Sequence, residues 1–89
     1  MTNIVKRRGH KEEYDERKAY ASSYAACRNA HLSEKEAESI ADKVTKDIEN
    51  WIEDKDEVDS KQIFEEVTKS LAKYNKDASF MYETHLDVS

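Results

Sequence analysis

Apolar residues recur along most of this chain with the three- and four-residue spacing of amphipathic helices. The clearest stretch begins after Ser33, which forms a capping-box pattern with Glu36. Its apolar positions share one helical face and are Ala37, Ile40, Ala41, Val44, Ile48, Trp51 and Ile52. The spacing predicts a helix over 34–53 that forms the main core helix, with Trp51 as an anchor near its end.

Three further helices are predicted, over 16–30, 61–74 and 77–86. Asp15 and Ser60 are favourable N-cap residues for the first two. The helix over 61–74 presents an apolar side of Ile63, Phe64, Val67, Leu71 and Tyr74. The last helix is expected to turn Ala78, Met81, Tyr82 and His85 inward. Four helices of this length are enough to enclose one modest core.

The predicted helix over 16–30 carries an apolar stripe made of small residues. These are Ala19, Ser22, Ser23, Ala26, Cys27 and Ala30. Small residues allow a neighbouring backbone or a ligand to come close, although they bury little area. Tyr20 and Tyr24 lie beside the stripe. They either close the edge of the core or contact a partner, because tyrosine is enriched in interfaces.

Residues 1–15 have a different pattern, in which two short strand-like runs flank Arg8 and Gly9. Gly9 is the only glycine in the chain, and glycine adopts the positive φ of a tight turn without strain. The pattern predicts a β-hairpin that acts as a lid over the helices. A loop over 8–10 would place Lys6 opposite Glu12. A two-residue loop would instead set two lysines opposite each other, which is unfavourable.

Composition supports a single domain over 1–89. Charged residues make up 39% of the 89 residues and proline is absent, so nothing interrupts long helices. The expected fold class is therefore mainly α: a four-helix bundle capped by an N-terminal β-hairpin. The formal net charge is −5, yet residues 1–18 hold six basic against four acidic side chains. The acidic remainder argues against direct binding of nucleic acid.

Little in the sequence points to catalysis, metal binding or a membrane. Cys27 is the only cysteine, and the three histidines have no metal-ligand spacing. No phosphate-binding glycine loop of a common nucleotide hydrolase is present. We therefore expect a protein that is not an enzyme. With no long apolar run and no signal peptide, a cytoplasmic location is expected.

The basic N-terminal segment suggests a site for a phosphorylated ligand. Lys6, Arg7 and Lys18 would converge near the start of the first helix, where charged donors add to the positive end of the helix dipole. Glu12 is a pure hydrogen-bond acceptor that suits the amino group of a base. The plain alternative is a charged hairpin whose ion pairs contribute little.

These residues resemble the opening of the ATP-cone domain. The motif here is Lys6, Arg7, Gly9, Glu12, Tyr14, Asp15 and Lys18, followed by helical segments of the expected length and order. The ATP cone is a regulatory nucleotide-binding module of ribonucleotide reductases and of the repressor of their genes. The resemblance also suggests a short third strand near 57–59. It implies ATP or dATP as the ligand, bound with Mg²⁺.

By this resemblance the nucleotide site consists of Val5, Lys6, Arg7, Glu12, Asp15, Lys18 and Ala19. The three cations would hold the triphosphate, and Glu12 and Asp15 would read the adenine. Two positions depart from the family pattern, since Ala19 replaces a bulky aliphatic residue and Ala21 a basic one. Both changes bear on affinity and on the number of nucleotides bound.

The context is expected to differ from that in the reductases and the repressor, because these 89 residues include neither a catalytic barrel nor a zinc ribbon. An output would pass through a protein partner, such as ribonucleotide reductase or a transcriptional regulator, or through a homo-oligomer. The alternative is a helical dimerisation domain without a nucleotide ligand, which would use Tyr20, Tyr24 and the last helix.

Overall fold

The computed structural model of the chain describes residues 3–5 and 11–85, with side chains described from residue 14 to residue 84. The helices are α1 (Glu16–Asn29), α2 (Glu34–Ile52), α3 (Ser60–Tyr74) and α4 (Lys76–His85). The strands are β1 (Asn3–Val5), β2 (Lys11–Glu13) and β3 (Glu57–Asp59). The predicted mainly helical class is confirmed, and each helix begins and ends within one residue of its predicted range.

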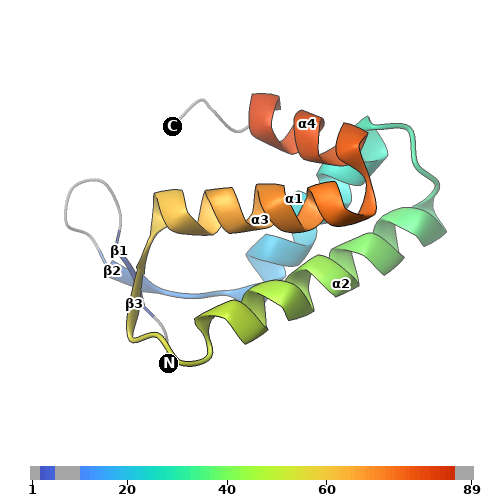
Figure 1. Ribbon diagram of the computed structural model, residues 1–89. Helices are drawn as coiled ribbons and strands as arrows, with labels where there is room; N and C mark the ends of the chain where they lie inside the picture. Colours follow the sequence, from blue (N-terminus) through green and yellow to red (C-terminus); the bar gives the residue numbers. More distant parts are fainter. Residues whose placement is uncertain (1–2, 6–10, 86–89) are drawn as a thin grey trace.

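The four helices form a closed ring of contacts. α1 packs against α2 and α4, and α3 packs against the same two helices. Figure 1 shows the strands at one end of this bundle, with α3 beginning beside them and α4 running back toward them. The starts of α1 and α3 therefore both lie at the end of the molecule that carries the strands.

The core is formed by bulky residues on α2 and α3, small residues on α1, and Ala78 and Tyr82 on α4. Val44, Ile48, Val67 and Leu71 are almost completely buried, as are Cys27 and Ala78. Trp51 lies at the edge of this core rather than at its centre, and Lys55 Nζ sits 4.9 Å from the centroid of its ring. Because α1 contributes mainly alanine, serine and cysteine, its backbone can approach α2 closely.

The three strands form one sheet in the order β2-β1-β3. β1 is antiparallel to β2 and parallel to β3, and Ile4 pairs with both Glu12 and Val58. The third strand expected at 57–59 is therefore present. The loop of the predicted hairpin, residues 8–10, lies outside the described residues, so the lid over the helices stays a prediction.

The predicted register was wrong by two residues. Lys6 was expected opposite Glu12, whereas Glu12 pairs with Ile4 and Val5 pairs with Lys11. A shift of two positions preserves the alternation of the strands. The pattern of apolar and polar residues therefore cannot distinguish the two registers, and only the length of the connection decides.

Two of the predicted helix caps are confirmed and one is corrected. Asp15 caps α1, and Ser33 with Glu36 forms a complete capping box at α2. Ser60 was expected to cap α3, but it is the first helical residue, and Asp59 is the N-cap. Asp59 accepts the Lys61 N–H at 2.9 Å and donates its own N–H to Gln62 Oε1 at 2.8 Å. Asp59 is the N-cap rather than Ser60, because its carboxylate forms a capping box with Gln62 three residues later.

Candidate functional site

The start of α1 is organised by contacts between Asp15 and Arg17. Asp15 Oδ1 accepts the backbone N–H of Arg17 at 3.0 Å, as an N-cap does. The Arg17 guanidinium also reaches back, with Nε 3.2 Å from Oδ1 and Nη2 3.2 Å from Oδ2. Hydrogen bonds from Arg17 lower the pKa of Asp15. The cap was predicted from the sequence, but the engagement of both carboxylate oxygens by Arg17 was not.

Lys18 and Ala19 occupy different faces of α1. Ala19 is buried against the core, whereas Lys18 is exposed. Helical geometry places Lys18 about 200° around the axis from Glu16, so these two side chains lie on different flanks. Ser22, one turn after Lys18, lines a groove with α4. Lys18 therefore stands on the flank of α1 that faces α4.

The other flank of α1 brings carboxylates together. The carboxylate of Glu49 on α2 lies close to that of Glu16. The interaction with Glu16, followed by burial, raises the pKa of Glu49. Tyr14 packs against the core nearby, and its hydroxyl is buried without a hydrogen-bond partner among the described residues. Burial, followed by the charges of Glu49 and Glu16, raises the pKa of Tyr14 to about 12. A polyphosphate would meet negative charge on this flank, so the flank of Lys18 suits it better.

The sheet supplies the remaining residues of the predicted site. Lys6 and Arg7 lie outside the described residues, and only the backbone positions of Val5 and Glu12 are described. Val5, the last residue of β1, pairs with Asp59, which caps α3. β1 therefore ends at the same end of the sheet at which α3 begins. The sequence indicated α1 as the helix whose start meets the basic segment, and that contact lies outside the described residues.

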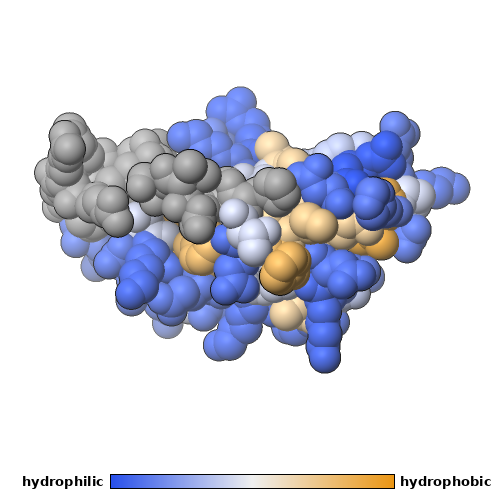
Figure 2. Space-filling view, turned by 90° about the horizontal axis from the view of Figure 1, so that it is seen from above, coloured by the Kyte–Doolittle hydropathy of each residue, from blue (hydrophilic) through white to orange (hydrophobic). Residues whose placement is uncertain are grey.

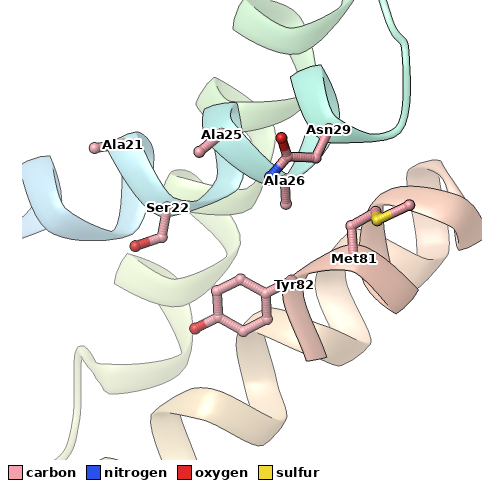
Figure 3. A pocket seen from close by; sticks show the side chains of 7 residues that line it. All are labelled: Ala21, Ser22, Ala25, Ala26, Asn29, Met81 and Tyr82. Carbon is pink, nitrogen blue, oxygen red and sulfur yellow. The ribbon is translucent and has the colours of Figure 1, made fainter. Parts of the chain in front are cut away.

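A groove between α1 and α4, which the sequence analysis missed, continues along the flank of Lys18. Its volume is about 290 Å³, and its lining carries no charged side chain: Ala21, Ser22, Ala25, Ala26, Asn29, Met81 and Tyr82. In Figure 3 the side chain of Ser22 on α1 and the ring of Tyr82 on α4 lie on opposite sides of this groove. Figure 2 shows patches of apolar surface on this upper face, surrounded by hydrophilic residues. Of the lining residues, Ser22 and Ala26 belong to the predicted stripe of small residues, which was the available signal.

A second groove, of about 320 Å³, lies between α2 and α3. Its charged residues are already paired, since Lys73 Nζ lies 3.0 Å from Asp47 Oδ2 and Lys69 Nζ lies 3.8 Å from Glu66 Oε1. Asp47 Oδ2 also accepts hydrogen bonds from Ser70 and Tyr74. This groove is therefore a polar junction between two helices rather than a charged ligand site.

Other chemistry has no support in the part of the chain that the structure describes. No group of three or more histidine, cysteine, aspartate or glutamate side chains is placed to hold a metal ion there. Cys27 is fully buried, and burial raises the pKa of its thiol. Such a thiol is a poor nucleophile. No helix among the described residues is long and apolar enough to span a membrane.

Comparison with known families decides the relationship that the motif suggested. The family model of the ATP cone domain matches residues 2–81. The chain belongs to the ATP-cone family. A search among curated proteins finds no match to it.

Membership of this family indicates the general role of the domain. The ATP cone is a regulatory, non-catalytic domain that binds ATP or dATP. The matched range covers the sheet and α1 to α3 and ends at Met81 within α4. All seven residues proposed for the nucleotide site, from Val5 to Ala19, fall inside it.

Proposed function

We propose that this ATP cone is a regulatory module that binds ATP or dATP at the sheet end of its helical bundle and transmits the bound state to another protein surface. The observation that carries the proposal is the match of the family over nearly the whole chain, together with the ordered motif from Lys6 to Lys18. We further propose that the single domain over 1–89 acts in the cytoplasm.

In this proposal Lys6, Arg7 and Lys18 hold the triphosphate. Lys18 lies on the α4-facing flank of α1, away from Glu16 and Glu49, and this position supports its proposed contact with the triphosphate. The pairing of Val5 with Asp59 supports a place for the phosphates at the end of the sheet where α3 begins. Mg²⁺ bound to the nucleotide would reduce repulsion from the carboxylates on the other flank of α1.

Glu12 and Asp15 read the adenine, and the hairpin covers the bound nucleotide as a lid. Val5 and Ala19 complete the site. Ala19 is buried beneath the first turn of α1, so its small side chain shapes the floor rather than offering a polar contact. The site then combines cations for the phosphates with acceptors for the amino group of the base.

The output is a population shift in which the nucleotide orders the lid and α1 and thereby changes a surface used for association. The surface belongs to a protein partner, for which ribonucleotide reductase or its transcriptional regulator is the expected class, or to a second copy of the chain. Phe80 on α4 supports such a surface, because its side chain is 61% exposed although it is large and apolar.

Thermal unfolding with and without MgATP tests nucleotide binding directly. A ligand that binds only the folded state at a concentration of about 100 times Kd adds about 2.7 kcal/mol to the free energy of unfolding. For a domain of this size, that corresponds to a rise in Tm of about 10–20 °C. An unchanged Tm at millimolar ATP would favour the alternative of a helical dimerisation domain.

The alternative has limited support from the described side chains. The rings of Tyr20 and Tyr24 stack with centroids 6.4 Å apart, and the carboxylates of Glu38 and Asp42 on α2 raise the pKa of Tyr20 after burial. The two tyrosines thus lie on the α2 side of α1, away from α4. One contact surface would not include both the tyrosine pair and α4.

Calorimetric titration of variants separates phosphate binding from base recognition. Lys18→Ala and Lys6→Ala are expected to weaken ATP and GTP alike by about 10- to 100-fold, as for the loss of one charged hydrogen bond. Lys35→Ala, which removes an exposed lysine at the start of α2, is the matched control and should leave both affinities unchanged. Glu12→Ala should mainly reduce the preference for adenine, and equal losses for ATP and GTP would contradict its role.

A further inference from the structure

The contact between Arg17 and Asp15 does more than close a helix end. The backbone N–H of Arg17 and its Nε both donate to Asp15 Oδ1, and its Nη2 donates to Oδ2. A carboxylate has about four lone-pair sites, so these contacts leave one, on Oδ2, for a further donor. The Asp15 that would face a base is therefore not a free carboxylate.

The remaining acceptor distinguishes the two purines by their hydrogen-bonding edges. Adenine offers an amino donor beside the N1 acceptor, and one lone pair can accept from that amino group. Guanine presents two donors side by side, N1–H and the 2-amino group, which suit a carboxylate with both oxygens free. A guanine donor that loses its water and gains no acceptor weakens the binding of guanine relative to adenine.

We propose that Arg17 is a specificity-determining residue that makes this site reject guanine nucleotides by occupying both oxygens of Asp15. The inference rests on the proposed function, in which Asp15 reads the base. Selectivity of this kind is obtained by opposing the wrong ligand rather than by adding contacts to the right one. Arg17 is not in the ATP-cone motif described above, so this role belongs to this chain and not to the pattern it shares.

The pair is suited to such a role because it contributes little to the fold. The side chain of Arg17 is 87% exposed and that of Asp15 is 30% exposed. Exposed ion pairs add little to stability. The N-cap hydrogen bond uses the backbone of Arg17, so a substitution there keeps the cap. Arg17→Gln should therefore fold normally. Without the guanidinium, Oδ2 is free and Oδ1 keeps only the N-cap hydrogen bond, so each oxygen can accept one donor of a guanine.

The test is calorimetric titration of the full chain with MgATP, MgGTP and inorganic tripolyphosphate. Arg17→Gln is expected to raise GTP affinity by about 5- to 100-fold, the range for a good two-point base contact, and to change ATP affinity far less. Asp15→Asn combined with Arg17→Gln should return GTP affinity to that of the unaltered chain. Arg28→Gln removes one positive charge at the other end of α1 and should change neither nucleotide.

Three results would overturn the inference and leave the proposed function intact. A parallel loss of ATP, GTP and tripolyphosphate affinity in Arg17→Gln would make Arg17 a phosphate ligand. A selective loss of GTP affinity would mean that Arg17 itself binds guanine. Unchanged affinities in Arg17→Gln would place the pair outside the site. If the unaltered chain binds none of the three ligands, the proposed function fails and the role of Arg17 fails with it.

Discussion

His31 has an unusual backbone at the end of α1. Its φ is 68°, in the left-handed region, and it is the only non-glycine residue with positive φ among those described. The Leu32 N–H bonds to the Cys27 carbonyl at 3.1 Å, and the His31 N–H bonds to the Arg28 carbonyl at 3.0 Å. These two bonds define a Schellman motif, in which the position of His31 is usually glycine.

Replacing His31 with glycine is expected to stabilise the protein. A left-handed residue other than glycine costs about 1–2 kcal/mol, and the greater freedom of glycine in the unfolded chain offsets part of that gain. A net gain of about 1 kcal/mol would raise Tm by about 4–8 °C. Thermal unfolding followed by circular dichroism measures it. The control is Asn29→Gly two residues earlier, where the backbone is helical and glycine should lower Tm.

Asp47 joins α2 to α3 at the level of the elements. Its Oδ2 accepts from Ser70 Oγ at 2.8 Å, Lys73 Nζ at 3.0 Å and Tyr74 Oη at 2.8 Å. Asp47→Ala is expected to cost about 1–3 kcal/mol, because three donors lose one charged acceptor in a partly exposed place. Urea unfolding measures this loss. Asp42→Ala on the same helix removes only an exposed pair with Lys46 and should change stability by less than about 0.5 kcal/mol.

The carboxylate of Asp47 should also make the stability of the fold depend on pH in the acid range. Burial alone would raise the pKa of Asp47, but the hydrogen bonds from Ser70, Lys73 and Tyr74 outweigh it and lower the pKa. A carboxylate with a lowered pKa adds stability above its usual value near 3.9, and this stability is lost as pH falls below that value. Unfolding measured from pH 6 to pH 2 should therefore show a shallower decline for Asp47→Ala than for the unaltered chain.

The helices were predictable from sequence because each carries several agreeing signals. Along α2 the capping box of Ser33 and the apolar spacing through Ile52 indicate the same element. The sheet was less predictable, because three-residue strands hold too few positions to define a register. Ser60 was assigned as the cap of α3 because a hydroxyl and a carboxylate at neighbouring positions are both good caps, and only the fold chooses Asp59.

The candidate site was predictable as a motif but not as a set of contacts. Lys18 and Asp15 were proposed from their spacing. The contact of the Arg17 guanidinium with both oxygens of Asp15 depends on a side-chain rotamer, which the sequence pattern does not indicate. The groove between α1 and α4 was missed because Ala21 and Ala25 have no distinctive chemistry in sequence. Only the packing of α4 makes the exposed flank of α1 into a lined cavity.

The stability of the whole molecule at alkaline pH depends on two tyrosines, Tyr82 and Tyr14. Burial raises the pKa of Tyr82 to about 12, and burial with nearby carboxylates raises that of Tyr14 to about 12. The folded state therefore holds these protons more tightly than the unfolded state, and stability should fall as pH rises from about 10 to 12. Tyr14→Phe should make this fall shallower in thermal unfolding. Tyr20→Phe, in a less buried place, should have a smaller effect.

The parallel pairing of β1 with β3 has a consequence for how the molecule assembles. The middle strand of the sheet is the first to leave the ribosome, yet Val58, the partner of Ile4, follows 54 positions later. β1 can therefore complete its bonding only after α1 and α2 have been synthesised, and a connection between residues so distant closes slowly. Pulse-labelling hydrogen exchange during refolding should protect the amides of α2 before those of β1. A strand that docks last is also expected to open easily, which suits the part of the molecule where we propose that a nucleotide enters and leaves.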